Sequence, residues 1–90
     1  MKYRIEFSSK FKKDYKKILK RGDGGITDSI IEKLANGEVL EPKYRDHALI
    51  GNYEGFRECH ILPNLLLIYK KDNDVLVLTC VRVGSHSECF

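Results

Sequence analysis

The chain has 90 residues, which is enough for one domain with a single hydrophobic core and too few for two. Its hydrophobic content of 42% excludes wholesale disorder, and no apolar run is long enough for a signal peptide or a membrane span. We therefore expect a cytoplasmic protein with no membrane partner. The net charge of +3 is uneven, because residues 1–21 carry a net +7 and residues 22–90 a net −4. This asymmetry indicates a face for a polyanion or an acidic protein, with a solvated lysine-rich helix as the equal alternative.

The cysteines are three in number and widely spaced, and no pair forms a CxxC motif. This pattern argues against a disulfide framework and against a zinc site. We expect Cys59 and Cys80 to be reduced and to fill the core as small apolar residues. Cys89, next to the C-terminus, is expected to be exposed.

The first part of the chain predicts a strand and then a helix. Residues 3–7 alternate apolar and polar side chains, which is typical of a short strand. Ser8 or Ser9 then provides an N-cap for a helix that runs to about Lys20. The apolar stripe of this helix has the spacing of one helical face and consists of Phe11, Tyr15, Ile18 and Leu19.

A second helix is expected from about Thr27 to Ala35. Its start is open, because three residues are suitable caps: Asp23, Thr27 and Ser29. Only a few residues separate the two helices, so we expect them to form an antiparallel hairpin.

The second half predicts three strands after an irregular loop. Residues 37–52 contain Pro42 and little periodicity, which favours a loop. The strands are expected at residues 53–62, 65–71 and 75–83, with no further element after them. The predicted fold is an α+β domain over residues 1–90, in the order strand, helix, helix, strand, strand, strand. Its helical hairpin packs on a mainly antiparallel four-stranded sheet.

Strand alternation indicates which side chains share a face of this sheet. In the first strand after the loop, Glu58 and His60 lie on one face and Cys59 on the other. In the last strand, Arg82 is expected on the same face as Cys80. His86 follows four residues after Arg82, where the end of the chain can reach a cleft. We expect His60, Arg82 and His86 to converge.

These residue types are suited to cleaving RNA without a metal or other cofactor. The reaction needs a base for the 2′-hydroxyl proton, an acid for the departing 5′-oxygen, and a cation for the phosphate. Histidine serves as either base or acid near neutral pH, and the guanidinium fork of arginine pairs with two phosphate oxygens. An aromatic ring, Phe90 or Tyr53, is expected to stack on a base.

Each candidate has a structural alternative. In this alternative, His47 after Asp46 is a loop residue that forms a local hydrogen bond, and His60 is a half-buried histidine whose ring is hydrogen-bonded to the backbone. In the same alternative, Arg82 pairs with an acidic neighbour on the sheet, and Phe90 anchors the chain end on the core. A metal site is disfavoured because the histidines show neither HxH nor HxxxH spacing.

The segments YRDHALIGNYEGFRECHILPNLLLIYK and VRVGSHSECF resemble the YafQ branch of the RelE/ParE toxin superfamily. The resemblance covers nearly the whole chain, and the spacing of RDH, RECHI-P and R-x-G-[ST]-H is specific. It implies a toxin of a bacterial toxin–antitoxin pair that binds the ribosomal A site and cuts mRNA there. It also implies a DinJ/RelB-type antitoxin as partner.

The resemblance assigns roles to individual residues. The catalytic histidines of the family correspond to three positions of this chain, which are His47, His60 and His86. The family's arginine corresponds to Arg82 and its terminal aromatic residue to Phe90. The family usually has an aspartate where this chain has Asn64, and an amide cannot accept a proton as a carboxylate does. The chain is therefore expected to be attenuated, or one of the histidines takes the proton instead.

The leading hypothesis is an endoribonuclease with His86 as the acid, His60 or His47 as the base, and Arg82 on the scissile phosphate. Lysines of the first helix are expected to bind ribosomal RNA: Lys10, Lys12, Lys13, Lys16 and Lys17. One alternative is a non-enzymatic inhibitor of DNA gyrase, as in the ParE branch. Another is a catalytically weakened toxin that acts mainly through antitoxin binding.

Overall fold

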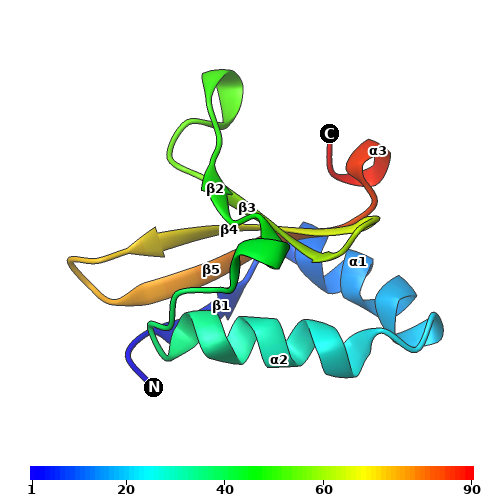
Figure 1. Ribbon diagram of the computed structural model, residues 1–90, viewed down its shortest axis with the longest axis horizontal. Coiled ribbons are helices and arrows are strands. Elements are labelled where there is room, and N and C mark those ends of the chain that lie inside the picture. Colours follow the sequence, from blue (N-terminus) through cyan, green and yellow to red (C-terminus); the bar gives the residue numbers. More distant parts are fainter.

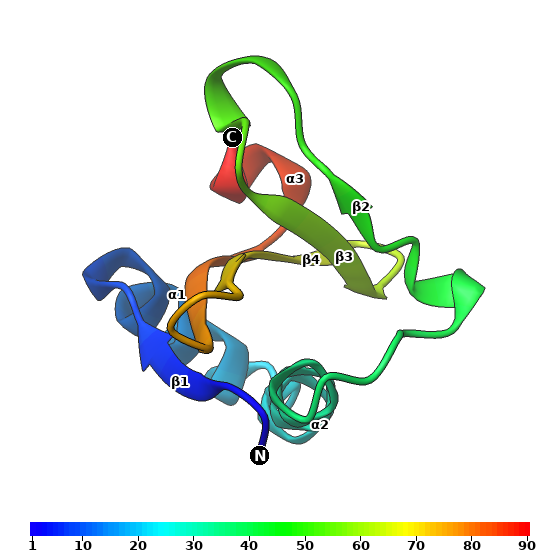
Figure 2. The same cartoon turned by 90° about the vertical axis from the view of Figure 1, so that its left-hand side faces the viewer.

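The computed structural model describes all residues, 1–90, as an α+β fold with one five-stranded sheet. Helices α1 and α2 cover one face of the sheet, and the short helix α3 lies on the other (Figures 1 and 2). The elements in chain order are β1 (Arg4–Phe7), α1 (Ser9–Lys20), α2 (Gly24–Ala35), the 3-10 helix η1 (Pro42–Tyr44), β2 (His47–Ala48), the 3-10 helix η2 (Gly51–Tyr53), β3 (Arg57–Leu62), β4 (Leu65–Asp72), β5 (Val77–Gly84) and α3 (His86–Cys89).

The sheet has the strand order β1-β5-β4-β3-β2. Strands β3, β4 and β5 are antiparallel neighbours, β1 runs parallel to β5, and β2 pairs antiparallel with β3. The fold class is therefore as predicted, with one more strand. The extra strand β2 has only two residues, His47 and Ala48, inside the predicted loop. Backbone pairing with β3 forms it, and two residues are too few to show strand alternation.

Helix α1 begins as its sequence predicts and buries a different set of residues. The Ser8 hydroxyl accepts a hydrogen bond from the Phe11 N–H at 3.0 Å, so Ser8 is the N-cap. Phe11 and Ile18 are buried, but Leu19, expected on the same stripe, is 54% exposed. The buried position between Phe11 and Ile18 is instead Asp14, which is 9% exposed.

Helix α2 ends at Ala35 as expected but begins at Gly24, three residues before the predicted Thr27. Thr27 is therefore a buried residue inside the first turns rather than a cap. Asp23 flanks the helix and makes no capping hydrogen bond with its side chain. None of the helices is long and apolar enough to cross a membrane.

The chain does not end in an irregular tail, because residues 86–89 form helix α3. Ser85 caps it: its hydroxyl accepts from the Glu88 N–H at 3.3 Å, and the Glu88 carboxylate accepts from the Ser85 N–H at 2.8 Å. This reciprocal pair is a capping box, which the spacing Ser-x-x-Glu signals in the sequence. The helix buries Cys89 to 5% exposure, so the expectation that this cysteine is exposed was wrong.

Strand β5 carries an irregularity that changes the side on which Arg82 lies. Cys80 pairs with Tyr69 but Arg82 pairs with Ile68, so β5 has one extra residue, Val81, between them. Cys80 and Tyr69 belong to the core cluster under the helices, whereas Arg82 and Ile68 do not. The prediction that Arg82 shares a face with Cys80 was wrong, because the bulge reverses the alternation after Cys80.

Candidate active site

The sheet face opposite α1 and α2 brings several candidate residues into one row. His47 of β2 pairs with Glu58 of β3, Glu58 with Ile68 of β4, and Ile68 with Arg82 of β5. His60 is two residues from Glu58 and therefore on the same face. Neighbouring strands are about 4.8 Å apart, so β3 and β5 are separated by about 10 Å. The sheet thus places His60 and Arg82 on one surface but not in contact.

Glu58 is the residue that joins two of the predicted histidines. Its Oε1 atom is 3.6 Å from Nε2 of His47 and 3.4 Å from Nε2 of His60. The Glu58 side chain is 8% exposed, whereas those of His47 and His60 are 51% and 21% exposed. A buried carboxylate therefore faces two imidazoles that are at least partly exposed.

His47 is held in a defined orientation by its own loop. Its Nδ1 atom lies 2.6 Å from the Arg45 carbonyl oxygen, so Nδ1–H is the donor and Nε2 faces Glu58. The local bond considered from the sequence is thus present. It directs Nε2 of His47 toward the same carboxylate that His60 faces.

The loop that carries His47 is fastened to the sheet by Asp46. The Tyr69 hydroxyl donates to Asp46 Oδ1 at 2.5 Å, and Arg57 Nε is 3.4 Å from the same oxygen. Burial and the bond to Asp46 raise the pKa of Tyr69 well above its ordinary value, so the phenol stays protonated. The aspartate of the RDH motif and the arginine of RECH therefore have a structural role, which is to position His47.

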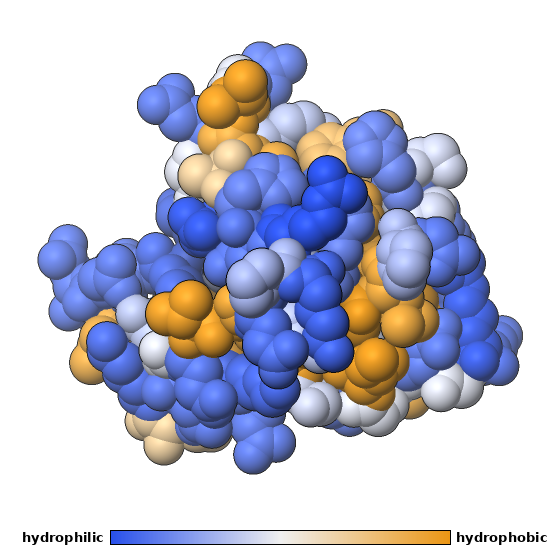
Figure 3. All heavy atoms as spheres, viewed as in Figure 1, coloured by the Kyte–Doolittle hydropathy of each residue, from blue (hydrophilic) through white to orange (hydrophobic).

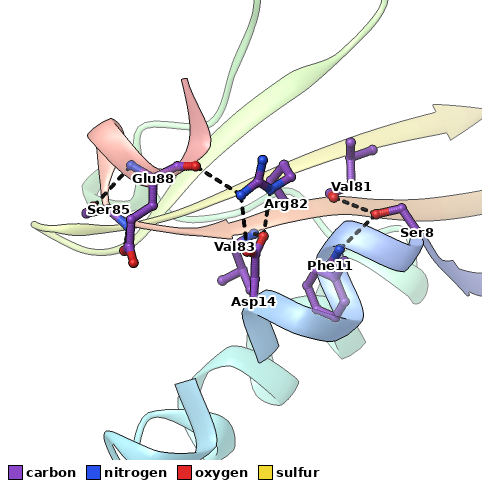
Figure 4. A network of polar contacts seen from close by, with 8 residues as sticks. All are labelled: Ser8, Phe11, Asp14, Val81, Arg82, Val83, Ser85 and Glu88. Atoms are coloured by element: carbon purple, nitrogen blue, oxygen red, sulfur yellow. Dashed lines mark hydrogen bonds and ion pairs between the residues drawn. The ribbon is translucent and has the colours of Figure 1, made fainter. Parts of the chain in front are cut away.

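Arg82 is bound inside the protein by a bidentate ion pair (Figure 4). Its Nε donates to Asp14 Oδ2 at 2.7 Å, and its Nη2 donates to Asp14 Oδ1 at 3.1 Å and to the Glu88 carbonyl at 2.9 Å. The hydrogen bond to Asp14 raises the pKa of Arg82. Arg82 therefore pairs with an acidic residue, but this partner lies on α1 and not on the sheet as the structural alternative expected. Only Nη1 has no partner within the protein, so a phosphate would meet one nitrogen of Arg82 rather than the free fork.

Asp14 lies beside Arg82 because α1 follows directly after β1 and runs along the part of β5 that β1 does not cover. Phe7, the last residue of β1, pairs with Cys80. Beyond that point the Ser8 hydroxyl donates to the Val81 carbonyl at 2.6 Å, and Asp14 Oδ2 accepts from the Val83 N–H at 3.2 Å (Figure 4). Asp14 thus satisfies an edge N–H and a guanidinium together. The sequence signal for it was an acidic residue within an apolar helical stripe.

His86 belongs to a second group, built around the last residue of the chain. Its ring centroid is 4.9 Å from that of Phe90, and the rings of Tyr53 and Phe90 form a T-shaped pair with centroids 4.9 Å apart. Phe90 is 41% exposed and lies outside the core cluster, so it does not anchor the chain end on the core. Since Arg82 binds the Glu88 carbonyl, it also holds α3, and with it His86, against the sheet.

The remaining predicted positions are at the surface. Asn64 is exposed in the turn between β3 and β4, and its side chain makes no hydrogen bond within the protein. The five lysines of α1 that were predicted to bind RNA are all exposed, on a helix that packs on the other face of the sheet from the histidines. They form a surface separate from the histidine row.

The cysteines are not part of either group. Burial raises the pKa of Cys59 and of Cys80 to about 12, and that of Cys89 to about 11. These thiols are protonated and unreactive at neutral pH. No group of three His, Cys, Asp or Glu side chains is arranged to hold a metal ion.

Comparison with known sequences identifies relatives over nearly the whole chain. Residues 3–90 match the family described as "Bacterial toxin of type II toxin-antitoxin system, YafQ". The mRNA interferase toxin YafQ of Escherichia coli K12 is 34% identical over 88 residues, which are 96% of this chain and 94% of that protein. A putative toxin YafQ of Haemophilus influenzae is 35% identical over 71 residues, 74% of this chain and 70% of that one.

Solved structures of similar sequence share the fold. A metal-bound toxin from Helicobacter pylori has a TM-score of 0.90 and 45% identity, with 98% of this chain and 99% of that chain covered. YafQ in the E. coli DinJ–YafQ complex has a TM-score of 0.87 and 33% identity, with 98% of each chain covered.

Proposed function

The chain belongs to the YafQ family of toxins of bacterial type II toxin–antitoxin systems, and from this we propose that it cleaves mRNA in the ribosomal A site by acid–base chemistry. The relative in E. coli is an mRNA interferase, which supports endoribonuclease activity for the family. The observation that carries the proposal for this chain is the buried Glu58 carboxylate facing the Nε2 atoms of both His47 and His60.

The proposed reaction assigns each proton to a side chain. His60 or His47 takes the 2′-hydroxyl proton, and Glu58 stabilises the imidazolium that results. The 2′-oxygen then bonds to phosphorus as the bond from phosphorus to the 5′-oxygen breaks. His86 donates its proton to the departing 5′-oxygen. The free Nη1 of Arg82 supports the charge on the phosphate, and Phe90 supports a neighbouring base.

The direct test adds the purified protein to translating ribosomes and maps the 5′ ends of the mRNA fragments. Cleavage within the A-site codon is expected. Intact mRNA together with inhibition of DNA supercoiling would instead support the gyrase-inhibitor alternative. The exposed lysines of α1 predict that ribosome binding weakens as the salt concentration rises, because binding to phosphate releases counterions.

Asn64→Asp is expected to raise the rate of ribosome-dependent cleavage by about tenfold, a modest share of what one acid–base group contributes. Asn64 is exposed at the end of β3 that carries His60, so a carboxylate there can orient an imidazole or accept a proton. Single-turnover cleavage of mRNA on ribosomes measures the effect. The control is Asn73→Asp, which adds the same charge in the turn at the opposite end of β4. Equal rates for Asn64→Asp and the parent would show that this chain is not attenuated by Asn64.

We propose that the partner of this toxin is a small acidic antitoxin, which the DinJ–YafQ complexes of E. coli support. The surface suited to it is an apolar hollow of about 320 Å³ between α1 and α2. Phe7, Phe11 and Tyr15 line it as a stack, with ring centroids 5.2 and 5.7 Å apart. Lys12 and Lys16 border it, so an amphipathic segment with acidic side chains is complementary.

Phe7→Ala is expected to weaken antitoxin binding by tenfold or more, because an exposed aromatic ring at the centre of an apolar interface contributes about 2 kcal/mol. Phe7 is 44% exposed, so its removal leaves the core intact. Titration calorimetry with the cognate antitoxin measures the change in affinity. Val75→Ala, which removes exposed apolar surface outside this hollow, is the control. Weak and strongly salt-dependent binding of the parent would argue against a tight apolar complex.

A further inference from the structure

A second hollow adjoins His60 and takes no part in the proton transfers proposed above. It has a volume of about 460 Å³, within the range of small-ligand sites. Its walls come from three segments: Ile26 of α2, residues 43–45 of the η1 loop, and residues 60–63 at the end of β3. In Figure 3 apolar atoms are exposed between the η1 loop and α2, with hydrophilic atoms around them. We name this hollow the His60 pocket.

The floor of the His60 pocket is apolar. Ile26, Ile61, Leu62 and Pro63 line it, and Ile26 is 38% exposed although it is a large aliphatic residue on a packed helix. The ring of Tyr44 forms part of the wall. Aromatic and apolar side chains together are the surfaces on which proteins stack an unpaired base.

The rim of the pocket carries two cations that the protein leaves largely unpaired. The Arg45 guanidinium makes no ion pair and no side-chain hydrogen bond. Lys43 lies 3.9 Å from Glu41, with the two side chains 67% and 65% exposed, and its Nζ is 5.1 Å from the centroid of the Tyr44 ring. Such a pair is weak and gives way to a phosphate. The pocket therefore combines an apolar floor with available positive charge.

The backbone at Arg45 is held in a conformation that residues other than glycine rarely adopt. Its φ and ψ are 49° and 42°, in the left-handed region. Two hydrogen bonds hold this turn: the Arg45 N–H donates to the Pro42 carbonyl at 3.0 Å, and His47 Nδ1–H donates to the Arg45 carbonyl at 2.6 Å. The same turn thus sets the rim of the pocket and the orientation of His47. Strain of this kind is found where a site requires a specific loop geometry.

We propose that the His60 pocket binds the nucleotide of single-stranded RNA that adjoins the scissile phosphate. The base lies on the floor of Ile26, Ile61 and Pro63, and its phosphate is bound by Lys43 and Arg45. This proposal rests on the proposed nuclease function, because His60 is both a wall of the pocket and a candidate base. Binding of this kind depends on stacking and charge, so the pocket accepts different bases.

The test compares two double variants that remove the same amount of charge. Lys43→Gln with Arg45→Gln removes the rim of the pocket, and Arg4→Gln with Lys20→Gln removes exposed cations elsewhere. A fluorescein-labelled hexamer of 2′-O-methyluridine is the binding probe, since it lacks the attacking hydroxyl and is not cleaved. Fluorescence anisotropy against salt concentration gives its affinity, and cleavage of ribosome-bound mRNA gives kcat and KM.

The rim variant is expected to bind the hexamer about tenfold more weakly, with a salt slope shallower by about 0.7 for each phosphate that is no longer neutralised. Its KM is expected to rise by a similar factor while kcat changes little. A variant with Lys43→Gln and Arg45→Lys, which restores the charge at residue 45, should recover most of the affinity that the rim variant loses. The control variant should match the parent within about twofold, because Arg4 and Lys20 lie outside the pocket.

Unchanged hexamer affinity and KM in the rim variant would overturn the proposal, even where cleavage by the parent upholds the nuclease function. A rim variant with reduced antitoxin affinity but normal hexamer affinity would also overturn it, because the pocket would then be a protein site. Conversely, a parent that does not cleave mRNA but binds the hexamer through the rim would uphold the RNA site while rejecting the nuclease.

Discussion

His86→Ala is expected to lower the rate of ribosome-dependent mRNA cleavage by about 10²- to 10⁴-fold, the usual contribution of a general acid. His86 is the first residue of α3, is exposed, and contacts only the ring of Phe90 among the site residues. Its removal therefore deletes a proton donor without disturbing the core. Single-turnover cleavage on ribosomes, with thermal unfolding as the check on folding, measures the effect.

A modified substrate tests whether His86 acts as the acid or as the base. An mRNA in which sulfur replaces the departing 5′-oxygen needs no protonation of the leaving group, because a thiol is far more acidic than an alcohol and a thiolate therefore departs without an acid. This substrate should restore cleavage by His86→Ala but not by His60→Ala or His47→Ala. If the sulfur substrate leaves His86→Ala inactive, His86 is not the acid. If His86→Ala cleaves normal mRNA at the parent rate, the histidine has no part in the chemistry.

Asp14→Ala is expected to lower the free energy of unfolding by about 3 kcal/mol, a large share of the total for a domain of this size. The change leaves the half-buried Arg82 guanidinium and the Val83 N–H without their acceptor. It also frees Arg82 from the position in which it binds the Glu88 carbonyl of α3. Urea-induced unfolding gives the free-energy change, and the cleavage assay shows whether the position of α3 matters for activity.

Two comparisons separate the ion pair from a general effect of removing a carboxylate. In the parent, the hydrogen bond to Asp28 raises the pKa of Tyr15 to about 12. Asp28→Ala removes this exposed acceptor and should lower the free energy of unfolding by less than about 1 kcal/mol. The double variant Asp14→Ala, Arg82→Leu should be more stable than Asp14→Ala alone, because it buries no unpaired charge. A decrease below about 1 kcal/mol for Asp14→Ala would show that water replaces the carboxylate.

The histidines show how far sequence reasoning extends toward the site. Alternation within β3 correctly placed Cys59 in the core and His60 on the other face, because strand geometry is local. His47 faces the same carboxylate as His60 because β2 pairs with β3 and places His47 opposite Glu58. This pairing joins segments that are separated in the chain. His60, Arg82 and His86 do not meet in one cluster as expected: His60 lies with His47 at Glu58, whereas Arg82 and His86 belong to the groups at Asp14 and Phe90. Whether they act together in catalysis stays a prediction.

By itself the sequence determined the α+β class, the two long helices, a serine cap at residue 8 or 9, the β3–β4–β5 meander and the candidate histidines. Each of these depends on periodicity, capping or turn residues within a few positions of one another. The tertiary structure decided the face on which Arg82 lies, its pairing with Asp14, and the meeting of His47 and His60 at Glu58. These features arise from a bulge, an unpaired sheet edge and strand register, which depend on residues far apart in the chain and leave no periodic signal in it.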